Sequence, residues 1–279
     1  NVLSQSDLRS LVTRHWTVIL IAILIYCFAY VPMTIAWIQL AEASGAQASR
    51  LALARVLLVS QIGKYIPGSI AQFLGRAYFA RAYGVPLAST GLAIALELAG
   101  ILAASGILAA AVMALELVGL QSAKAESLMW LLGAAGAATL FGSALVLRNR
   151  GREAIIFLNP LLWAICLYVA VLALLALANS IIIAEIEDSW SLSMATKVAG
   201  AFLVSWLIGF ATPGSPAGLG VRELTFFALL SSSIPLETLL LTPTGFRLVT
   251  IVGDGIAWLA GVCLPVRKGD PTSPEPIPI

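Results

Sequence analysis

Residues 16–41 read WTVILIAILIYCFAYVPMTIAWIQLA, a run with no charged side chain that is long enough to cross a bilayer as one helix. Lipid offers no hydrogen bonds to the backbone, so such a run is expected to fold as an α-helix, with a kink at Pro32. Similar runs recur along the chain, which is 60% apolar and only 11% charged. Nothing alternates with the period of two that a barrel strand requires. The sequence predicts a single-domain, all-α integral membrane protein, a polytopic helix bundle.

The other apolar runs are of two kinds, unbroken and interrupted. Unbroken spans are predicted at 87–118, 127–147, 159–184 and 245–266. Two interrupted segments, 51–83 and 197–230, break at 63–69 and 212–217, where glycine, proline and serine gather. These residue types end helices or turn the chain, so each interrupted segment is predicted to be a pair of shorter helices. Residues 269–279 hold four prolines and are predicted to form a disordered tail.

The two breaks resemble each other in a way that suggests an internal repeat. A shift of 146 residues superposes four positions of the first break on the second: Gly63 on Gly209, Pro67 on Pro213, Ser69 on Ser215 and Arg76 on Arg222. The same shift lays a first half, about 15–118, over a second half, about 158–266, with the span 127–147 between them. Glycine and proline are common in helix breaks, so a chance match is the alternative. The added serine and arginine favour the repeat.

The single additional span between the halves, at 127–147, determines their relative orientation in the membrane. If each interrupted segment is a re-entrant hairpin that returns to its starting side, the span at 127–147 inverts the second half. An inverted-topology repeat is a common plan of secondary transporters, in which paired Gly/Pro-interrupted segments mark the substrate site. In the rival arrangement the first interrupted segment crosses the bilayer once.

The charges of the loops predict how the protein lies in the cell membrane. The basic loop at 148–152 and the basic pair at 267–268 are expected in the cytoplasm, which leaves the acidic loop at 185–188 outside. With both hairpins re-entrant, Arg9 and Arg14 then fall outside, against the positive-inside rule. A further helix before residue 1 would remove this conflict, and we expect one.

Charged side chains also lie within or beside the apolar runs, where a charge at the bilayer centre costs on the order of 3 kcal/mol. They are Arg55, Lys64, Arg76, Arg81, Glu97, Arg222, Glu223, Arg247 and Asp254. Internal pairing is one explanation, with the candidate pairs Arg76–Glu97 and Arg247–Asp254. Arg55 and Arg81 are expected to extend toward lipid headgroups. Because six of the nine are basic and three acidic, a bound anion would help to balance the set.

The helices that begin after Gly68 and after Pro216 would direct free N–H groups and a positive dipole end into the gap between them. Arginine offers planar, bidentate donors that suit a phosphate. The sequence therefore predicts an anion-binding site made of Lys64, Pro67, Gly68, Ser69, Arg76, Glu97, Pro213, Gly214, Gly218, Gly220, Arg222, Glu223, Arg247 and Asp254. The basic members would hold the phosphate. The three carboxylates would neutralise them in the empty site or carry a coupling proton.

The remaining reactive residues argue against an enzyme. His15 is the only histidine and adjoins Trp16 at the edge of the first span, a position typical of an interfacial residue rather than a metal ligand. Cys27, Cys166 and Cys263 are far apart and lack the spacing of a metal or redox site. A net charge of +2 without a basic tract does not indicate nucleic-acid binding. We expect no catalytic set, no metal and no cofactor.

Both breaks resemble motifs of the lysylphosphatidylglycerol synthase transmembrane family, also called the flippase-like domain family. Its first motif, Pro-Gly followed by Gly-Arg and a Glu in the next helix, is similar to Pro67-Gly68, Gly75-Arg76 and Glu97. Its second motif, Pro-Gly-Gly-Leu-Gly-Val-Arg-Glu, is similar to Pro213-Gly214 with residues 218–223 and is the more specific of the two. The resemblance covers essentially the whole chain, and members usually start with one more helix.

Two departures from the family pattern affect the site. Residues 215–217 are inserted before the Gly-Leu-Gly core of the second motif, and Phe73-Leu74 replace the acidic residue that often precedes the arginine of the first. The aminoacyltransferase domain of some members is not expected here. The resemblance therefore implies lipid translocation or lipid-linked sugar metabolism rather than lysine transfer.

These features lead to the hypothesis of a lipid transporter. It would move the headgroup of an anionic phospholipid or a polyprenyl phosphate through a polar cavity between two hairpins, with membrane lipids as its partners. One alternative is a non-catalytic subunit that presents a lipid-linked substrate to a glycosyltransferase or acyltransferase. Another is an ion-coupled carrier of small anions. A lipid-modifying enzyme or a second copy of the chain are the protein partners considered.

Overall fold

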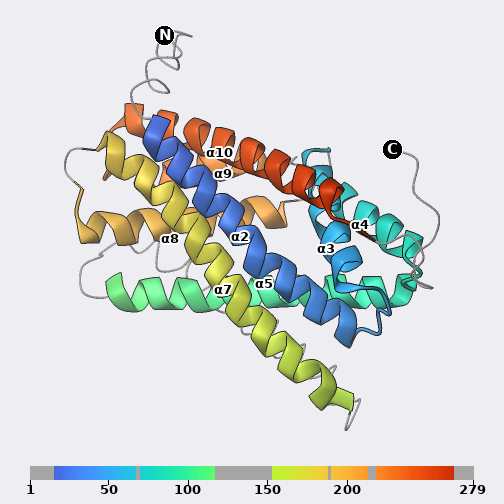
Figure 1. Cartoon of the computed structure of the whole chain (residues 1–279). Helices are drawn as coiled ribbons and strands as arrows, with labels where there is room; N and C mark the ends of the chain where they lie inside the picture. The colour runs from blue at the N-terminus through green and yellow to red at the C-terminus, as the bar shows by residue number, and fades with distance from the viewer. Residues whose placement is uncertain (1–15, 67–69, 117–152, 188–189, 213–217, 267–279) are drawn as a thin grey trace.

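The computed structural model describes residues 16–66, 70–116, 153–187, 190–212 and 218–266. Within these ranges every regular element is a helix, which confirms the predicted all-α class for this part of the chain (Figure 1). The long helices are α2 (Trp16–Ala43), α5 (Leu87–Glu116), α7 (Glu153–Ile186), α8 (Leu192–Ala211) and α10 (Leu236–Cys263). The short ones are α3 (Arg50–Ser60), the 3-10 helix η1 (Gln61–Tyr65), α4 (Ala71–Ala82) and α9 (Val221–Leu230).

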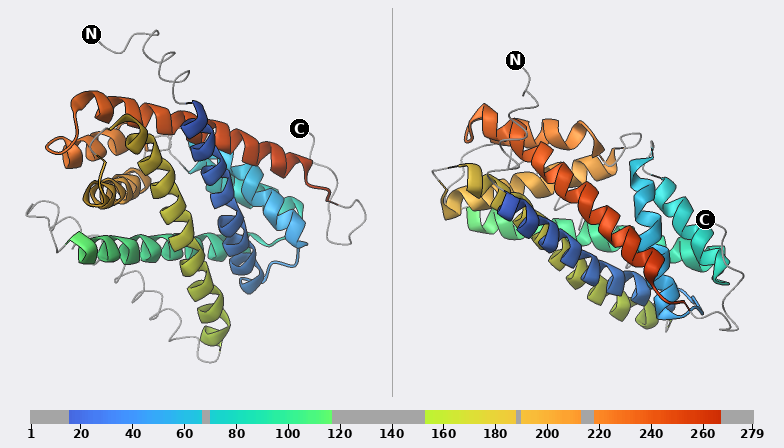
Figure 2. Two further views of the ribbon diagram at one scale, coloured as in Figure 1. Left: turned by 60° about the vertical axis from the view of Figure 1, so that its left-hand side comes forward. Right: turned by 45° about the horizontal axis from the view of Figure 1, so that its top comes forward.

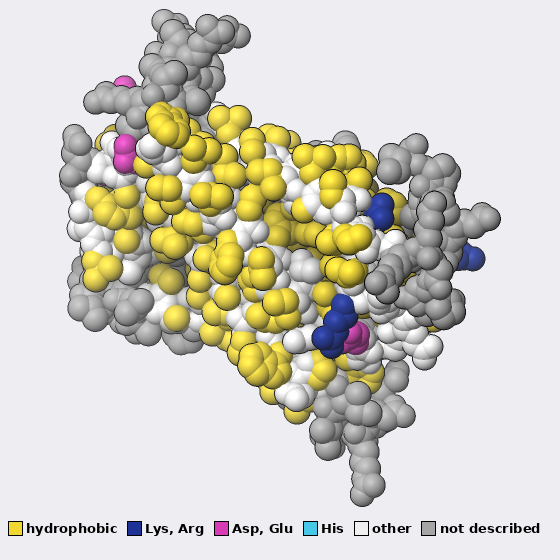
Figure 3. Space-filling view, in the orientation of Figure 1, with side chains coloured by type: hydrophobic (Ala, Val, Ile, Leu, Met, Phe, Trp, Pro, Cys, Tyr) yellow, Lys and Arg dark blue, Asp and Glu magenta, His cyan; other side chains and the backbone are white. Residues whose placement is uncertain are grey.

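Five helices are long and apolar enough to cross a membrane. They are found at Trp16–Ala43, Leu87–Leu108, Phe157–Ile186, Leu192–Phe210 and Leu236–Cys263. Large apolar side chains point outward from them; Leu24 and Phe28 of α2, for example, are 68% and 61% exposed. On the face shown in Figure 3, apolar side chains cover α2, α7 and α10, and the charged ones lie near its ends. An outer surface of this kind fits lipid rather than water, so the chain is a multi-pass membrane protein.

Helices α2 and α7 pack along each other in opposite directions at the centre of the molecule (Figures 1 and 2). Helix α2 buries alanine at every seventh position, at Ala22, Ala29 and Ala36, and α7 buries Ala164 and Ala178. Small side chains let two backbones approach closely, and such packing is a main attraction between helices in lipid. Pro32 lies inside α2, as predicted.

The other long helices flank this central pair. Helices α5 and α10 lie on either side of it and run in opposite directions (Figure 1). Helix α5 contacts α7 and α8, and α10 contacts α2, α3 and α7. Helix α8 lies along α9 and also contacts α7. The layout of a long helix, an interrupted segment and a long helix therefore occurs twice in the described chain.

The first interrupted segment connects the end of α2 to the start of α5, which lie on the same side of the molecule (right in Figure 1). Ser49 caps α3 by accepting a hydrogen bond from the N–H of Ala52 at 3.3 Å, and η1 follows directly. Gly63 lets η1 approach α4, because a Cβ there would lie 2.7 Å from the backbone nitrogen of Gln72. Any larger residue would separate the two halves of the break.

The second interrupted segment connects the end of α7 to the start of α10, both on the opposite side of the molecule (left in Figure 1). Ser191 caps α8 by accepting from the N–H of Met194 at 3.2 Å. Before α9 the chain turns at Gly218 and Gly220, whose φ angles of +76° and +80° strain any residue with a side chain. These two glycines fall in the motif that the sequence analysis singled out.

Some predicted bounds were wrong. Helix α10 begins at Leu236 rather than at residue 245, and it includes Pro243. The hydroxyl groups of Thr242 and Thr244, on either side of this proline, donate to backbone carbonyls one turn earlier at 2.7 and 3.1 Å. The acceptors are the carbonyls of Thr238 and Leu240, which flank the Leu239 carbonyl that the proline leaves without its helical donor. The predicted span 127–147 and the predicted tail 269–279 lie outside the described residues.

Candidate functional site

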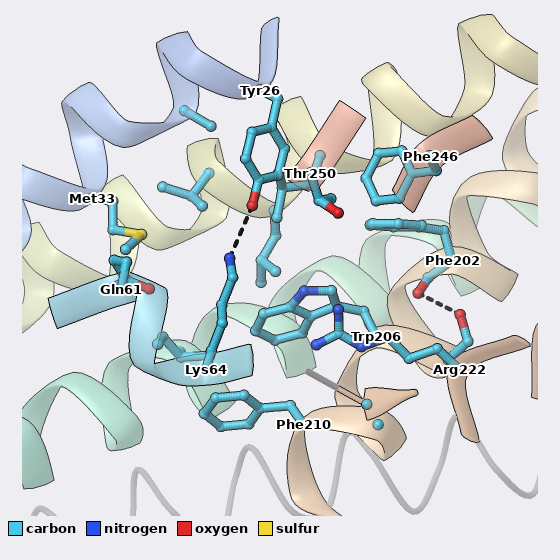
Figure 4. Close-up of a pocket in the computed structure, with 18 of the residues that line it drawn as sticks. Tyr26, Met33, Gln61, Lys64, Phe202, Trp206, Phe210, Arg222, Phe246 and Thr250 are labelled. Atoms are coloured by element: carbon cyan, nitrogen blue, oxygen red, sulfur yellow. Dashed lines mark hydrogen bonds between the residues drawn. The ribbon is translucent and has the colours of Figure 1, made fainter. Parts of the chain in front are cut away.

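A cavity of about 430 Å³ lies between the two interrupted segments. Its walls come from α2, η1, α4, α5, α7, α8, α9 and α10, so both halves of the chain contribute. Figure 4 shows Lys64 of η1 and Arg222 of α9 entering this space from different sides, near Trp206. Six charged residues line the cavity: Lys64, Arg76, Glu97, Arg222, Glu223 and Arg247.

The predicted pair of Arg76 and Glu97 is confirmed. Arg76 of α4 forms a salt bridge with Glu97 of α5, and their side chains are only 1% and 4% exposed. The guanidinium carbon also lies 4.5 Å from the ring centroid of Trp37, a cation–π contact. Removing one partner of a buried pair leaves an uncompensated charge, which costs about 3–5 kcal/mol. This pair therefore fastens α4 to α5 at one wall of the cavity.

Asp254 of α10 is buried behind Lys64 and is held by four donors. The Lys64 Nζ lies 2.7 Å from its Oδ2. The hydroxyl groups of Tyr26 and Tyr30 donate to its Oδ1 at 2.8 and 2.5 Å, and the hydroxyl group of Tyr65 donates to its Oδ2. Three helical segments, α2, η1 and α10, thus meet at one carboxylate.

Arg247 pairs with Glu223. The predicted pairing of Arg247 with Asp254 was wrong. Its Nε donates to Oε1 of Glu223 at 2.6 Å, and the two side chains are 27% and 30% exposed. Arg247 and Asp254 lie about 10 Å apart along α10, at a rise of 1.5 Å per residue, whereas α9 places Glu223 directly beside Arg247. Internal pairing was the correct expectation here, but the partner was wrong.

Arg222 is the cation of the cavity that has no carboxylate partner among the described residues. Its Cζ lies 5.4 Å from the ring centroid of Trp206, and its buried Nε makes no hydrogen bond with the described chain. Two glycines leave room for the side chain. A Cβ on Gly209 would overlap its Cγ, and one on Gly218 would lie 2.6 Å from its Nε. The absence of a side chain at these two glycines therefore allows Arg222 to lie at the cavity wall.

The charges around the cavity do not cancel in the part of the chain that the structure describes. Four cations line it, and three carboxylates pair with three of them. One positive charge remains, in a protein interior where an unpaired charge is costly. A bound anion would compensate it, which supports the anion preference expected from the sequence.

The rest of the wall is aromatic and apolar. Trp206 and Phe210 stack with their ring centroids 5.2 Å apart and their planes 7° from parallel. Phe246 packs edge-on against Phe202 and Tyr26. These rings make this part of the wall apolar, and an electrostatic contact beside an apolar wall is stronger than one in water. The cavity therefore suits a group that is anionic and partly apolar.

Half of the predicted site residues line this cavity: Lys64, Arg76, Glu97, Gly218, Arg222, Glu223 and Arg247. Asp254 lies one layer behind, 1% exposed, and is linked to the wall through Lys64. Gly220 precedes α9 and does not line the cavity. Arg55 and Arg81 do not line it either. The remaining predicted members lie outside the described residues: Pro67, Gly68, Ser69, Pro213 and Gly214.

The tyrosines around Asp254 were not among the predicted site residues, although the sequence contains a signal for them. Tyr26 and Tyr30 are four residues apart and so share one helix face, and both lie inside an apolar run. Tyrosine in a membrane helix is typical of the interface, so a pair at mid-span indicates a buried polar contact. Trp206 gave no such signal, because its role depends on α9 folding back beside α8.

The described residues contain no group of histidine, cysteine, aspartate and glutamate arranged to hold a metal ion. No protein-family model, curated protein or solved structure matches the chain. The chemistry of the cavity and the arrangement of the helices around it are therefore the observations that bear on function.

Proposed function

We propose that the protein is a lipid transporter that moves the anionic headgroup of a phospholipid or a polyprenyl phosphate across the bilayer through this cavity. The uncompensated cation carries the proposal. Arg222 lies at the cavity wall without a carboxylate partner among the described residues, and its guanidinium is a planar donor that fits a phosphate. The motif resemblance to the flippase-like domain family points in the same direction.

The arrangement of the helices supports transport. Helices α2 and α7, at matching positions in the two halves, run in opposite directions, and so do α5 and α10 (Figure 1). Each interrupted segment starts and returns on one side, and the two segments do so from opposite sides. These features favour two re-entrant hairpins in an inverted-topology repeat. In that plan, broken helices of both halves meet at a substrate site near the midplane.

The size and lining of the cavity favour a headgroup as the cargo. A volume of about 430 Å³ lies at the small end of the range for ligand pockets. It accommodates a phosphate with a polar substituent, while the acyl or polyprenyl chains stay in the membrane. The aromatic wall of Trp206, Phe210 and Phe246 gives the apolar part of such a lipid a surface to contact.

Headgroup translocation in proteoliposomes tests the proposal. Fluorescent phosphatidylglycerol is placed in both leaflets, dithionite bleaches the outer leaflet, and the remaining signal reports movement from the inner one. Wild type is expected to accelerate this movement more for phosphatidylglycerol than for phosphatidylcholine. Arg222→Ala should slow it at least about tenfold, because a charge-assisted hydrogen bond contributes roughly 1.5–3 kcal/mol. Arg81→Ala, which removes an arginine outside the cavity wall, should transport like wild type.

One outcome would assign a different function. Lys64, Glu223 and Arg247 are partly exposed, so an anion can reach them without any opening of the buried Arg76–Glu97 pair. A subunit that presents a lipid-linked substrate to a glycosyltransferase or acyltransferase needs only this access. Folded wild-type protein that binds phosphatidylglycerol but accelerates no lipid would favour presentation over transport. Equal acceleration by wild type and Arg222→Ala would remove the site assignment.

A further inference from the structure

Lys64 differs from Arg247, another paired cation of the cavity, in how its carboxylate partner is held. The carboxylate of Glu223 accepts from Arg247 at Oε1, and its buried Oε2 makes no hydrogen bond with the described residues. Asp254, in contrast, accepts from three tyrosine hydroxyl groups in addition to its contact with Lys64. Without its cation, Glu223 would lose the hydrogen bond at Oε1, whereas Asp254 would keep three.

The tyrosines satisfy Asp254 without help from Lys64. Tyr26 and Tyr30 occupy one carboxylate oxygen and Tyr65 occupies the other, so both oxygens retain a donor when the ammonium group leaves. Hydrogen bonds to the charged form stabilise a carboxylate, and two or three of them have a large effect. Lys64 can therefore move away while the buried carboxylate of Asp254 keeps its hydrogen bonds.

Lys64 also has a short route from Asp254 to the cavity. Its side chain lines the cavity and is 20% exposed, whereas that of Asp254 is 1% exposed. The ammonium donates to the hydroxyl oxygen of Tyr26 at 3.1 Å and lies 5.6 Å from the ring centroid of Tyr65. Figure 4 shows it between Tyr26 and Trp206, on the side of the cavity that faces Arg222. A four-carbon stem lets the ammonium move by bond rotation alone.

We propose that Lys64 is an exchangeable counter-ion of the anion site. In the empty cavity it neutralises Asp254; when an anionic headgroup arrives, it moves to the anion while the three tyrosines retain the carboxylate. This inference rests on the proposed function and adds a second cation to Arg222. The anion is then held by one cation from each half of the chain, and in the empty cavity Lys64 stays paired with Asp254.

Binding of dihexanoyl phosphatidylglycerol to purified protein in neutral detergent tests the exchange by isothermal titration calorimetry. Asp254→Asn should tighten binding about tenfold, because Lys64 no longer has a competing carboxylate; coupling of this size is ordinary for residues in contact. In a Lys64→Gln background the same substitution should produce only the smaller effect of a distant charge. An equal gain in both backgrounds would overturn the proposal.

A tyrosine substitution provides a second test that changes no charge. Tyr30→Phe removes one donor from Asp254, so the carboxylate should hold Lys64 more tightly and phosphatidylglycerol binding should weaken about threefold, the value of a modest hydrogen bond. In the Lys64→Gln background Tyr30→Phe should have no effect on binding. Tyr78→Phe, on a side chain that is 65% exposed, is the matched control. Equal weakening with and without Lys64 would contradict the exchange.

Failure of this inference can be told apart from failure of the proposed function. Folded wild-type protein that binds no phosphatidylglycerol would overturn the anion site and the exchange together. Binding that requires Arg222 but is insensitive to Asp254→Asn and Tyr30→Phe would overturn the exchange alone. Size-exclusion elution and thermal unfolding identify variants that do not fold, and Tyr30→Phe tests the exchange even if Asp254→Asn does not fold.

Discussion

Arg222 keeps its position because two neighbouring residues have no side chains. Gly209 lies against its aliphatic stem and Gly218 against its Nε, while Trp206 offers the face of its ring. A cation–π contact contributes about 0.5–2 kcal/mol, which is small beside the cost of an unpaired buried charge. Aromatic contact therefore orients the guanidinium but does not replace a counter-ion, which leaves the side chain ready for an anion.

At the residue scale, Gly209→Ala should disable Arg222 without changing any charge. The new methyl group would overlap the Cγ of Arg222, so the whole side chain would have to shift away from the cavity. Phosphatidylglycerol translocation, measured by dithionite bleaching, should fall toward that of Arg222→Ala. Gly91→Ala is the control, since a Cβ there meets no atom within 4 Å. Wild-type translocation by Gly209→Ala would show that the position of Arg222 is unimportant.

At the scale of elements, a buried ion pair joins α4 to α5. Glu97→Gln should destabilise the protein by about 3–5 kcal/mol, because it leaves Arg76 charged and unpaired between α4 and α5. Thermal unfolding in lipid nanodiscs measures the loss. The double variant Arg76→Met/Glu97→Leu should recover much of it. If the double variant is as unstable as the single one, the stranded charge is not the cause.

The exposed pair of Glu42 and Arg50 provides the matching control for that experiment. Their side chains are 35% and 76% exposed, so water and salt already screen the contact. Glu42→Gln removes the same charge as Glu97→Gln and should leave thermal unfolding almost unchanged. A comparable loss of stability in both variants would mean that burial of the pair is not what matters.

Most helices could be predicted from the sequence, because composition alone determines where a chain is stable in lipid. Both interrupted segments lie where the sequence predicted them, except that α8 begins at Leu192 rather than at residue 197. The start of α10 was not predicted, since proline normally ends a helix, whereas α10 continues through Pro243.

The partners of the cavity charges were harder to predict than the helices. Arg76 and Glu97 were paired correctly from the sequence. The partner of Asp254 was not, because Lys64 reaches it only through the packing of η1 on α10. Contacts of this kind depend on the arrangement of helices distant in sequence, about which local pattern carries no information.

At the scale of the whole molecule, cysteine accessibility tests the inverted repeat. In a background with Cys27, Cys166 and Cys263 replaced by alanine, single cysteines are introduced at exposed positions beside the interrupted segments: Gln47→Cys, Ala88→Cys, Ser193→Cys and Ser232→Cys. A membrane-impermeant maleimide should label the first two from one side of the membrane and the last two from the other. Labelling of the first two from opposite sides would mean that the first interrupted segment crosses the bilayer.

The Lys64–Asp254 contact joins the two halves of the chain, and it has no counterpart at the positions that the proposed repeat relates to it. The shift that relates the halves places Lys64 opposite Phe210, and Asp254 opposite Leu108, so the matching pair of positions is apolar. On the proposed repeat, identical halves would make the inward-open and outward-open forms equal in free energy. If the ion pair stabilises one of these forms by about 1.4 kcal/mol, roughly ten empty molecules would be open toward one leaflet for each one open toward the other. When a headgroup binds and releases Lys64 from Asp254, this difference in population would disappear.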